Sequence, residues 1–278
     1  MVIKAALLQL NSGDDPAVNL GETKALIAEA VSRNSTFVLT PEVTNCVSTS
    51  RERQASVLCH EQDDPTLHAL RQTAADHGIW LLIGSLALLT DDHDGRFANR
   101  SFLIAPDGGI RARYDKIHMF DVAVSQTETY RESANYRPGT RAVIGETDFA
   151  TIGMTICYDL RFPGLYRGLA QAGARILAVP SAFSPVTGAA HWESLLRARA
   201  IETGCFVLAP AQTGTHAASH GRQRQTHGHS LAVGPWGDIL ADGGTDAGVV
   251  EVDLDMAATE NARERIPSFG ITSDFAGP

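Results

Sequence analysis

Short apolar runs alternate with helical segments through most of this chain, and this order limits the fold more than any other feature. Six runs have the length and composition of buried strands: residues 4–10, 37–40, 79–89, 150–156, 175–180 and 206–209. Four segments between them have helical spacing or helix-end residues: residues 16–31, 67–77, 165–172 and 192–203. Strands that alternate with helices form sheets covered by helices, so we expect an α/β protein.

Turn residues add hairpins to this pattern. Residues 99–105 and 110–114 flank the turn "PDGG" and predict one hairpin. Near the end, "HSLAVGPWGDIL" and "GVVEVDLD" contain strands separated by Pro-Trp-Gly and Gly-Gly turns, which favours mixed sheets. The chain has 278 residues, 44% of them hydrophobic, and no Gly/Ser/Pro-rich linker, so we expect a single domain over residues 1–278. No fixed-period repeat is visible.

Charge and cysteine content exclude several classes of function. The net charge is -9 without a lysine/arginine block, which disfavours nucleic acids and anionic membranes as partners. No apolar run has the length of a membrane span, and the first residues lack the features of a signal peptide. We therefore expect a cytoplasmic protein with reduced thiols at its four cysteines: Cys46, Cys59, Cys157 and Cys205.

Three ionisable residues follow the carboxyl ends of expected strands. Glu42 follows "FVLTP", Lys116 follows "ARYD" and Cys157 follows "GMTI". Open α/β sheets bind ligands at the carboxyl ends of their strands, so three strands would deliver these side chains to one pocket. Taken singly, each residue has a structural explanation: core filler for the cysteine and a solvated charge for the other two.

Amide cleavage through a thioester needs this set of groups. The cysteine sulfur attacks the amide carbon, while the glutamate takes the thiol proton and later passes one to the leaving ammonia. The lysine ammonium, together with a backbone N–H near Tyr158, faces the oxyanion of the tetrahedral intermediate. Water activated by the glutamate then hydrolyses the thioester.

Longer stretches around these residues resemble one enzyme family. "TPEV", "YDKIHMFDV" and "CYDLRFP" are similar to the Glu, Lys and Cys signatures of the nitrilase (carbon–nitrogen hydrolase) superfamily. "PSAFSPVTGAAHWESLLRARAIETGCFVLAPAQTG" and "GHSLAVGPWGDIL" resemble its Nit branch, which includes deaminated glutathione amidases and ω-amidases. The similarity covers nearly the whole chain.

The resemblance implies an α-β-β-α sandwich, a homo-oligomer of at least a dimer, and an amidase. It assigns Glu42 as base, Lys116 as oxyanion partner and Cys157 as nucleophile. A second glutamate often supports the lysine in this family. Glu132, in "YRESANYRPG", fits that position, and Glu128 is the alternative.

Three features depart from the branch pattern. Gly164 stands where a glutamate commonly follows "RFP", and Ala189 stands where proline commonly precedes "AHWE". Both positions bear on loops that shape the pocket. The tail "IPSFGITSDFAGP" lacks the basic ending common in the branch, which bears on the assembly.

Two further residues suggest that the substrate carries a carboxylate. Arg161 lies four residues after Cys157, and an arginine fork can hold a carboxylate through two parallel hydrogen bonds. Thr187, in "SPVTG", would add a hydroxyl to the same carboxylate. The structural alternatives are a salt bridge from Arg161 to Asp159 or another acid, and a loop cap for Thr187.

The stretch "APAQTGTH" resembles deaminated glutathione amidases, whereas ω-amidases more often carry a serine-proline-alanine stretch. We therefore expect the substrate to be a γ-glutamyl-type α-keto amide of the deaminated glutathione kind. The alternative is a short dicarboxylate monoamide such as α-ketoglutaramate.

Other interpretations fit less of the sequence. Four histidines crowd one region: His216, His220, His227 and His229. Their spacing matches no zinc pattern, so we expect a polar, mobile loop from 216 to 227 and no metal site. We expect no cofactor, because the glycine-rich pieces lack nucleotide-binding spacing. A non-catalytic binding protein would not need the whole trio, and a redox sensor would need a resolving thiol, for which Cys46 is the candidate.

Overall fold

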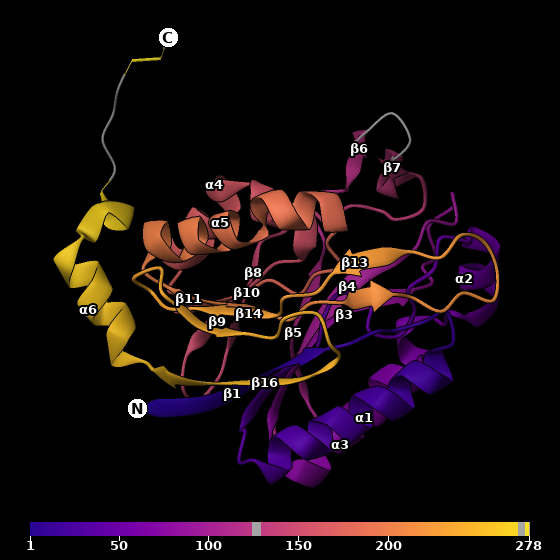
Figure 1. The fold of residues 1–278 in the computed structure, drawn as a ribbon, viewed down its shortest axis with the longest axis horizontal. Helices are drawn as coiled ribbons and strands as arrows, with labels where there is room; N and C mark the ends of the chain where they lie inside the picture. Colours follow the sequence, from indigo (N-terminus) through magenta and orange to yellow (C-terminus); the bar gives the residue numbers. More distant parts are fainter. Residues whose placement is uncertain (124–128, 272–275, 278) are drawn as a thin grey trace.

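Two six-stranded sheets form the centre of the computed structural model, which describes residues 1–123, 129–271 and 276–277 (Figure 1). The first sheet has the order β16 (Gly248–Asp255), β1 (Val2–Gln9), β2 (Phe37–Leu39), β3 (Trp80–Leu88), β4 (Ala98–Ile104), β5 (Ile110–Asp115). The second has the order β15 (Ile239–Asp242), β14 (Leu231–Val233), β11 (Phe206–Ala209), β10 (Ile176–Ala178), β9 (Thr151–Met154), β8 (Val143–Glu146). Two short hairpins join β6 (Asp121–Ala123) to β7 (Thr129–Arg131) and β12 (Thr213–Thr215) to β13 (Gln225–His227).

The two sheets share one plan, although the sequence has no visible repeat. In each, three parallel strands form the centre, β1-β2-β3 in one and β9-β10-β11 in the other, and antiparallel strands flank them. β5 runs in the same direction as β3, because the pairings of β3 with β4 and of β4 with β5 are both antiparallel, and β3 is parallel to β2. The carboxyl ends of β2 and β5 therefore lie at the same edge of the first sheet.

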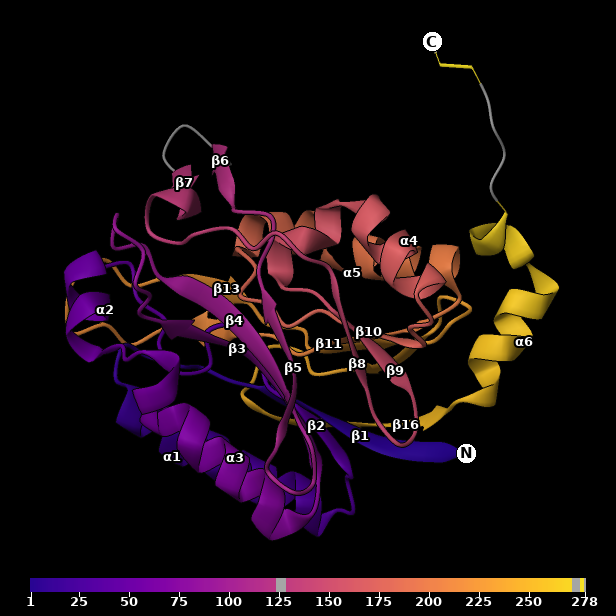
Figure 2. The same ribbon diagram turned by 180° about the vertical axis from the view of Figure 1, so that it is seen from behind.

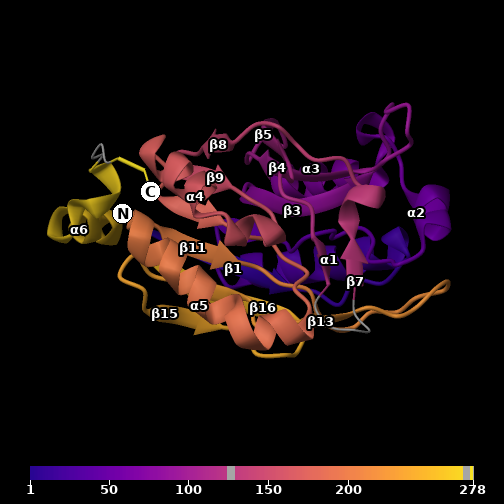
Figure 3. The same ribbon diagram turned by 90° about the horizontal axis from the view of Figure 1, so that it is seen from above.

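Helices cover the outer faces of both sheets. α1 (Pro16–Ser32) and α3 (Pro65–His77) pack on the first sheet, and α4 (Pro163–Gln171) and α5 (Pro185–Thr203) pack on the second (Figures 1 and 2). The expected α-β-β-α sandwich is confirmed. α2 (Arg51–Val57) and α6 (Ala257–Arg265) lie at opposite ends of the molecule, as the view in Figure 3 also makes clear.

Helix-end residues act largely as the sequence predicts. Asp15 caps α1 by accepting from two backbone N–H groups, and Gly78 ends α3 in the left-handed region at φ 62°. α5 begins at Pro185, earlier than the predicted start at Trp192, because Ser184 caps it and Pro185 suits the first turn.

Apolar side chains fill the space between the sheets and the space between each sheet and its helices. The layer between the sheets takes side chains such as Leu7 and Phe37 from one sheet and Ile152 and Ile176 from the other. A second layer lies between the first sheet and its helices and includes Leu8. Adjacent residues of β1 thus serve opposite layers, which explains why the central strands read as continuous apolar runs.

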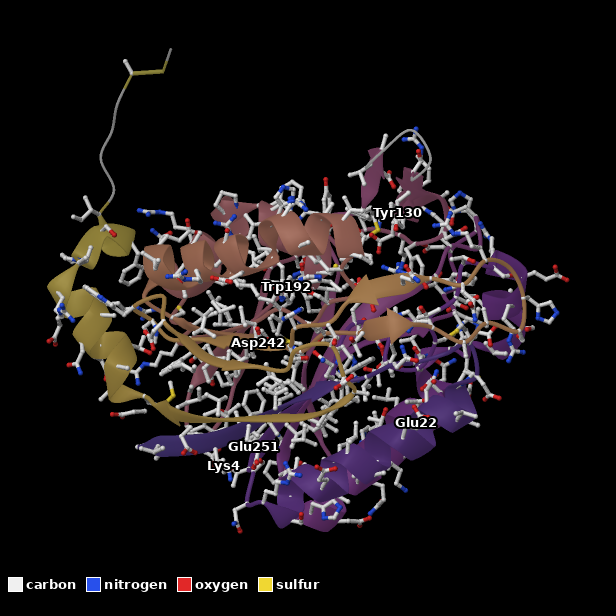
Figure 4. All side chains as sticks on the ribbon, viewed as in Figure 1. Lys4, Glu22, Tyr130, Trp192, Asp242 and Glu251 are labelled. Atoms are coloured by element: carbon white, nitrogen blue, oxygen red, sulfur yellow. The ribbon has the colours of Figure 1, made fainter. Side chains whose placement is uncertain are left out.

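The first and last strands of the large sheets pair with each other. β1 and β16 are antiparallel over their whole length, from Val2 opposite Asp255 to Gln9 opposite Gly248. Lys4 Nζ lies 2.9 Å from Glu251 Oε1 across this pair (Figure 4). Within the described residues, no helix is both long and apolar enough to cross a membrane.

Candidate active site

The three residues of the predicted trio line one cavity. Glu42 follows β2, Lys116 follows β5 and Cys157 follows β9, so the cavity, of about 390 Å³, draws on loops from both sheets. Glu132, Tyr158 and Thr187 also line it. This volume lies in the range of ordinary small-molecule sites.

Lys116 is buried between two carboxylates. Its Nζ lies 2.8 Å from Glu42 Oε1 and 2.8 and 2.9 Å from the two oxygens of Glu132. Burial alone would lower the pKa of Lys116, but Glu132 and Glu42 outweigh it and hold that pKa well above its ordinary value. The side chain is therefore a charged ammonium. Glu128, the alternative to Glu132, lies outside the described residues.

Both oxygens of Glu42 accept hydrogen bonds. Oε1 accepts from Lys116 and from Asn99 Nδ2 at 2.8 Å, and Oε2 accepts from the backbone N–H of Ala182 at 2.9 Å. Burial would raise the pKa of Glu42, but Lys116 and then Arg224 outweigh it, and the pKa lies below its ordinary value. Glu42 is thus an ionised carboxylate available as a base.

The backbone presents Cys157 on a sharp turn. Its φ is 49°, in the left-handed region that residues with a side chain seldom adopt, and its N–H donates to Pro180 O at 3.0 Å. Burial, followed by the charge of Glu42, raises the pKa of the Cys157 thiol, and Lys116 only partly offsets this. The resting group is a neutral thiol.

Close packing fixes the loop that carries Glu42. Val43 also has φ 49°, and the strand glycine Gly84 lies so near this loop that an added Cβ would sit 1.9 Å from Thr40 O. Gln212, from the "APAQTGTH" stretch, donates to Glu42 O at 3.1 Å. This stretch thus supports the backbone of the candidate base.

Asp159 connects the lysine loop to the cysteine turn. This buried carboxylate accepts from Tyr114 Oη at 2.6 Å, from His118 N at 3.0 Å and from Ile156 N at 2.9 Å. From the sequence, Asp159 is a candidate only for a salt bridge with Arg161. Its actual contacts are on the first sheet's loop and on the strand end before Cys157, so it holds the two halves of the site together.

Arg161 is not among the described residues that line the cavity. Its guanidinium lies 5.5 Å from the ring centre of Phe183 and 6.0 Å from that of Tyr158, and its Nη2 is 3.2 Å from His191 Nδ1. Thr187 lies in the first turn of α5 and does reach the cavity, with its Oγ1 3.0 Å from Ser184 Oγ. A carboxylate contact for either residue stays a prediction.

The expectation of a polar, mobile loop from 216 to 227 is wrong in part. His216 is buried, its Nδ1 lies 2.8 Å from Ser12 O and its Nε2 2.7 Å from Thr226 Oγ1, because β13 pairs with β12 and encloses it. Burial, together with the charge of Arg224, lowers the pKa of His216 to about 4. His227 and His229 stack at 4.7 Å, and no potential metal cluster occurs in the described part of the chain.

All four cysteines carry free thiols. Cys46 also lines the cavity, but burial, followed by the charge of Asp14, raises its pKa to about 12. A thiol with a raised pKa is a poor nucleophile toward oxidants, so a redox pair of Cys46 with Cys157 has little physical support.

Comparison with known proteins fits this geometry. The sequence profile of the carbon-nitrogen hydrolase family matches residues 4–264. The chain belongs to the carbon–nitrogen hydrolase family. It is therefore a hydrolase that acts on carbon–nitrogen bonds other than peptide bonds.

Similar proteins cover nearly the whole chain. It is 38% identical to the deaminated glutathione amidase of Yersinia enterocolitica over 94% of this chain and 90% of that protein. The crystal structure of the Caenorhabditis elegans NitFhit protein matches with a TM-score of 0.88 and 33% identity, over 97% of this chain and 64% of that one. Saccharomyces cerevisiae Nit3, a member of branch 10 of the nitrilase superfamily, matches with a TM-score of 0.84 and 28% identity, over 96% and 94%.

Proposed function

We propose that this protein is an amidase that cleaves a small carboxylate-bearing α-keto amide through a thioester on Cys157. The first candidate substrate is deaminated glutathione, and the alternative is α-ketoglutaramate. The observation that carries the proposal is the buried ammonium of Lys116, held between Glu42 and Glu132 in the cavity that Cys157 also lines. Acyl transfer requires a nucleophile, a base and a positive charge that stabilises the oxyanion, and Cys157, Glu42 and Lys116 supply these three groups.

Acylation begins from a neutral thiol and an ionised carboxylate. The proton of Cys157 passes to Glu42 as Sγ bonds to the amide carbon, and the carbonyl oxygen becomes an oxyanion that faces the charge of Lys116 and the backbone N–H near Tyr158. The tetrahedral intermediate then collapses. Its C–N bond breaks while Glu42 returns the proton to the departing nitrogen.

The leaving group depends on the amide. A primary amide such as α-ketoglutaramate releases ammonia. Deaminated glutathione has only secondary amides, so the same step releases the amine of cysteinylglycine. Both substrates leave the same 2-oxoglutaryl group on Cys157.

Deacylation repeats these steps with water. Glu42 takes a proton from water as the oxygen attacks the thioester carbon, and the C–S bond breaks as the proton returns to sulfur. The products are 2-oxoglutarate and the free thiol, and Glu42 is again ionised. No further reactant is needed.

The charge of the cavity supports an anionic substrate. Its described lining has four cationic side chains, from Lys116, Arg131, Arg222 and Arg224, and two anionic ones, in a chain whose net charge is -9. A basic cavity in an acidic protein concentrates anions. Deaminated glutathione carries two carboxylates and α-ketoglutaramate carries one, which favours the first candidate.

Assembly, domain organisation and location follow as further proposals. α5 exposes Val186 and Ile201, which supports a homodimer or larger homo-oligomer, measurable by sedimentation. The shared core of the two sheets supports one domain over the chain. The free thiols support a cytoplasmic location, where Cys157 stays reduced.

One assay tests the function, because both substrates yield 2-oxoglutarate. We expect the wild type to release it from deaminated glutathione with the higher kcat/KM, and Cys157→Ala to release none from either substrate. A higher kcat/KM for α-ketoglutaramate would assign an ω-amidase instead. If neither substrate reacts but iodoacetamide labels Cys157 in the intact protein above pH 9, the proposed substrate is wrong. A Cys157 that stays inert even at that pH would favour a binding protein.

A further inference from the structure

The cavity has a basic wall that the proposed acyl-transfer steps do not use. The connection between β12 and β13, residues 216–224, contains no acidic residue and contributes Arg222 and Arg224 to the lining. Gln223 and Gln225 line the cavity beside them. This wall therefore presents hydrogen-bond donors and positive charge.

Arg224 has a donor without a partner. Its Nη2 donates to Ala182 O at 2.6 Å, whereas its Nε is buried and has no hydrogen-bond partner among the described residues. No described carboxylate forms an ion pair with this guanidinium, either. An arginine that lines a cavity without a described carboxylate to pair with its charge points to an anion that arrives with the ligand.

The position of Arg224 relative to Glu42 indicates which part of the ligand it meets. Lys116 holds Oε1 of Glu42, and the backbone N–H of Ala182 holds Oε2. The carbonyl of the same Ala182 accepts from Arg224. Lys116 therefore contacts Glu42 at Oε1, whereas Arg224 lies beside Ala182, the residue whose N–H holds Oε2.

This separation corresponds to two substituents of the amide carbon. The carbonyl oxygen must face Lys116, and the departing nitrogen must face Glu42, which gives it a proton. A positive charge beside Ala182, on the Oε2 side of Glu42, is thus the one we assign to the departing nitrogen.

We propose, resting on the amidase function above, that Arg224 binds a carboxylate on the leaving-group half of the substrate. An amine that carries a carboxylate, such as a dipeptide released from a γ-glutamyl-type amide, fits this site. Ammonia does not use it. Arg224 then selects secondary amides with an acidic leaving group over primary amides.

The test uses two substrates with the same acyl half. Deaminated glutathione and α-ketoglutaramate differ only in the leaving group, so the ratio of their kcat/KM values isolates the leaving-group contact. We expect Arg224→Gln to lower this ratio about 10- to 100-fold, mainly through KM for deaminated glutathione, because one charge-assisted hydrogen bond is lost. Assays at pH 8 keep Glu42 ionised in the variant.

A modified substrate completes the cycle. Deaminated glutathione with its glycine carboxylate converted to an amide should react with the wild type as poorly as the natural substrate reacts with Arg224→Gln, and the variant should show no further loss with it. Thermal unfolding of the variant confirms that it folds.

Three results would overturn the inference. Equal losses for both substrates would mean that Arg224 acts through Glu42. An equal effect of Arg222→Gln would assign the selectivity to the charge of the wall. A wild type that cleaves α-ketoglutaramate but not deaminated glutathione would refute the leaving-group site and leave the amidase proposal intact, whereas no cleavage of either would refute both.

Discussion

Replacing Glu132 by glutamine tests whether the second carboxylate orients Lys116. The Glu132 carboxylate accepts from Lys116 Nζ with both oxygens, and Oε2 also accepts from Phe120 N at 2.6 Å. Glutamine has the same size but only one oxygen. Its NH₂ group must face either Lys116 or the Phe120 N–H, so two donors meet and one contact is lost.

The contact that is lost sets the size of the effects on stability and on kcat. A hydrogen bond to a charged group contributes about 1.5–3 kcal/mol, so we expect the free energy of unfolding to fall by about 2 kcal/mol. For a chain of this size that lowers Tm by about 4–8 °C. Without its second partner, Lys116 moves toward Glu42 and away from the oxyanion. Loss of one oxyanion donor lowers kcat by roughly 10²–10³, and we expect a fall of about 100-fold in kcat with little change in KM.

Glu61→Gln is the matched control. Glu61 binds Arg100 at 2.6 Å and Arg113 at 2.7 Å, and its side chain is 22% exposed against 15% for Glu132, but it does not line the cavity. This control should lose stability and keep the wild-type kcat for 2-oxoglutarate release. If Glu132→Gln also lost stability and kept kcat, the carboxylate would be only a structural partner and the argument would be refuted.

Two other predictions follow from the site. Because burial raises the pKa of the Cys157 thiol, its rate of alkylation by iodoacetamide should still rise above pH 9; a plateau near the free-cysteine value of about 8.5 would contradict this. Gly84→Ala should leave little soluble protein, because its Cβ would lie 1.9 Å from Thr40 O, whereas Gly21→Ala, with no atom within 4 Å of the new Cβ, should raise Tm slightly. Soluble yield and thermal unfolding compare the two, and a Gly84→Ala protein that folds normally would count against the close approach.

Much of the fold could be predicted from local patterns. The central strands are buried on both faces, so β3 and β9 stand out as apolar runs, and Asp15 and Gly78 mark helix ends by their chemistry. The two small hairpins could not be predicted in the same way. β6, β7, β12 and β13 have three residues each, too few for a period, and tertiary pairing decides them.

The site divides along the same line. Glu42, Lys116 and Cys157 could be predicted because each follows a strand, strand ends converge, and the stretches around all three resemble one enzyme family. Asp159 and Arg224 could not, because their importance lies in contacts across the two sheets and with the β12–β13 connection. The sequence does carry one signal for Arg224: residues 216–224 contain no acidic residue that could neutralise its charge.

The pairing of β1 with β16 has a consequence for synthesis of the protein. The ribosome makes β1 first and its antiparallel neighbour β16 almost last. Until β16 emerges, one edge of β1 has free N–H and C=O groups that can pair with another unfinished chain. Lysine on such an edge opposes this pairing. Lys4 therefore discourages aggregation of the nascent chain, and the same side chain stabilises the last strand through Glu251 once the sheet is complete.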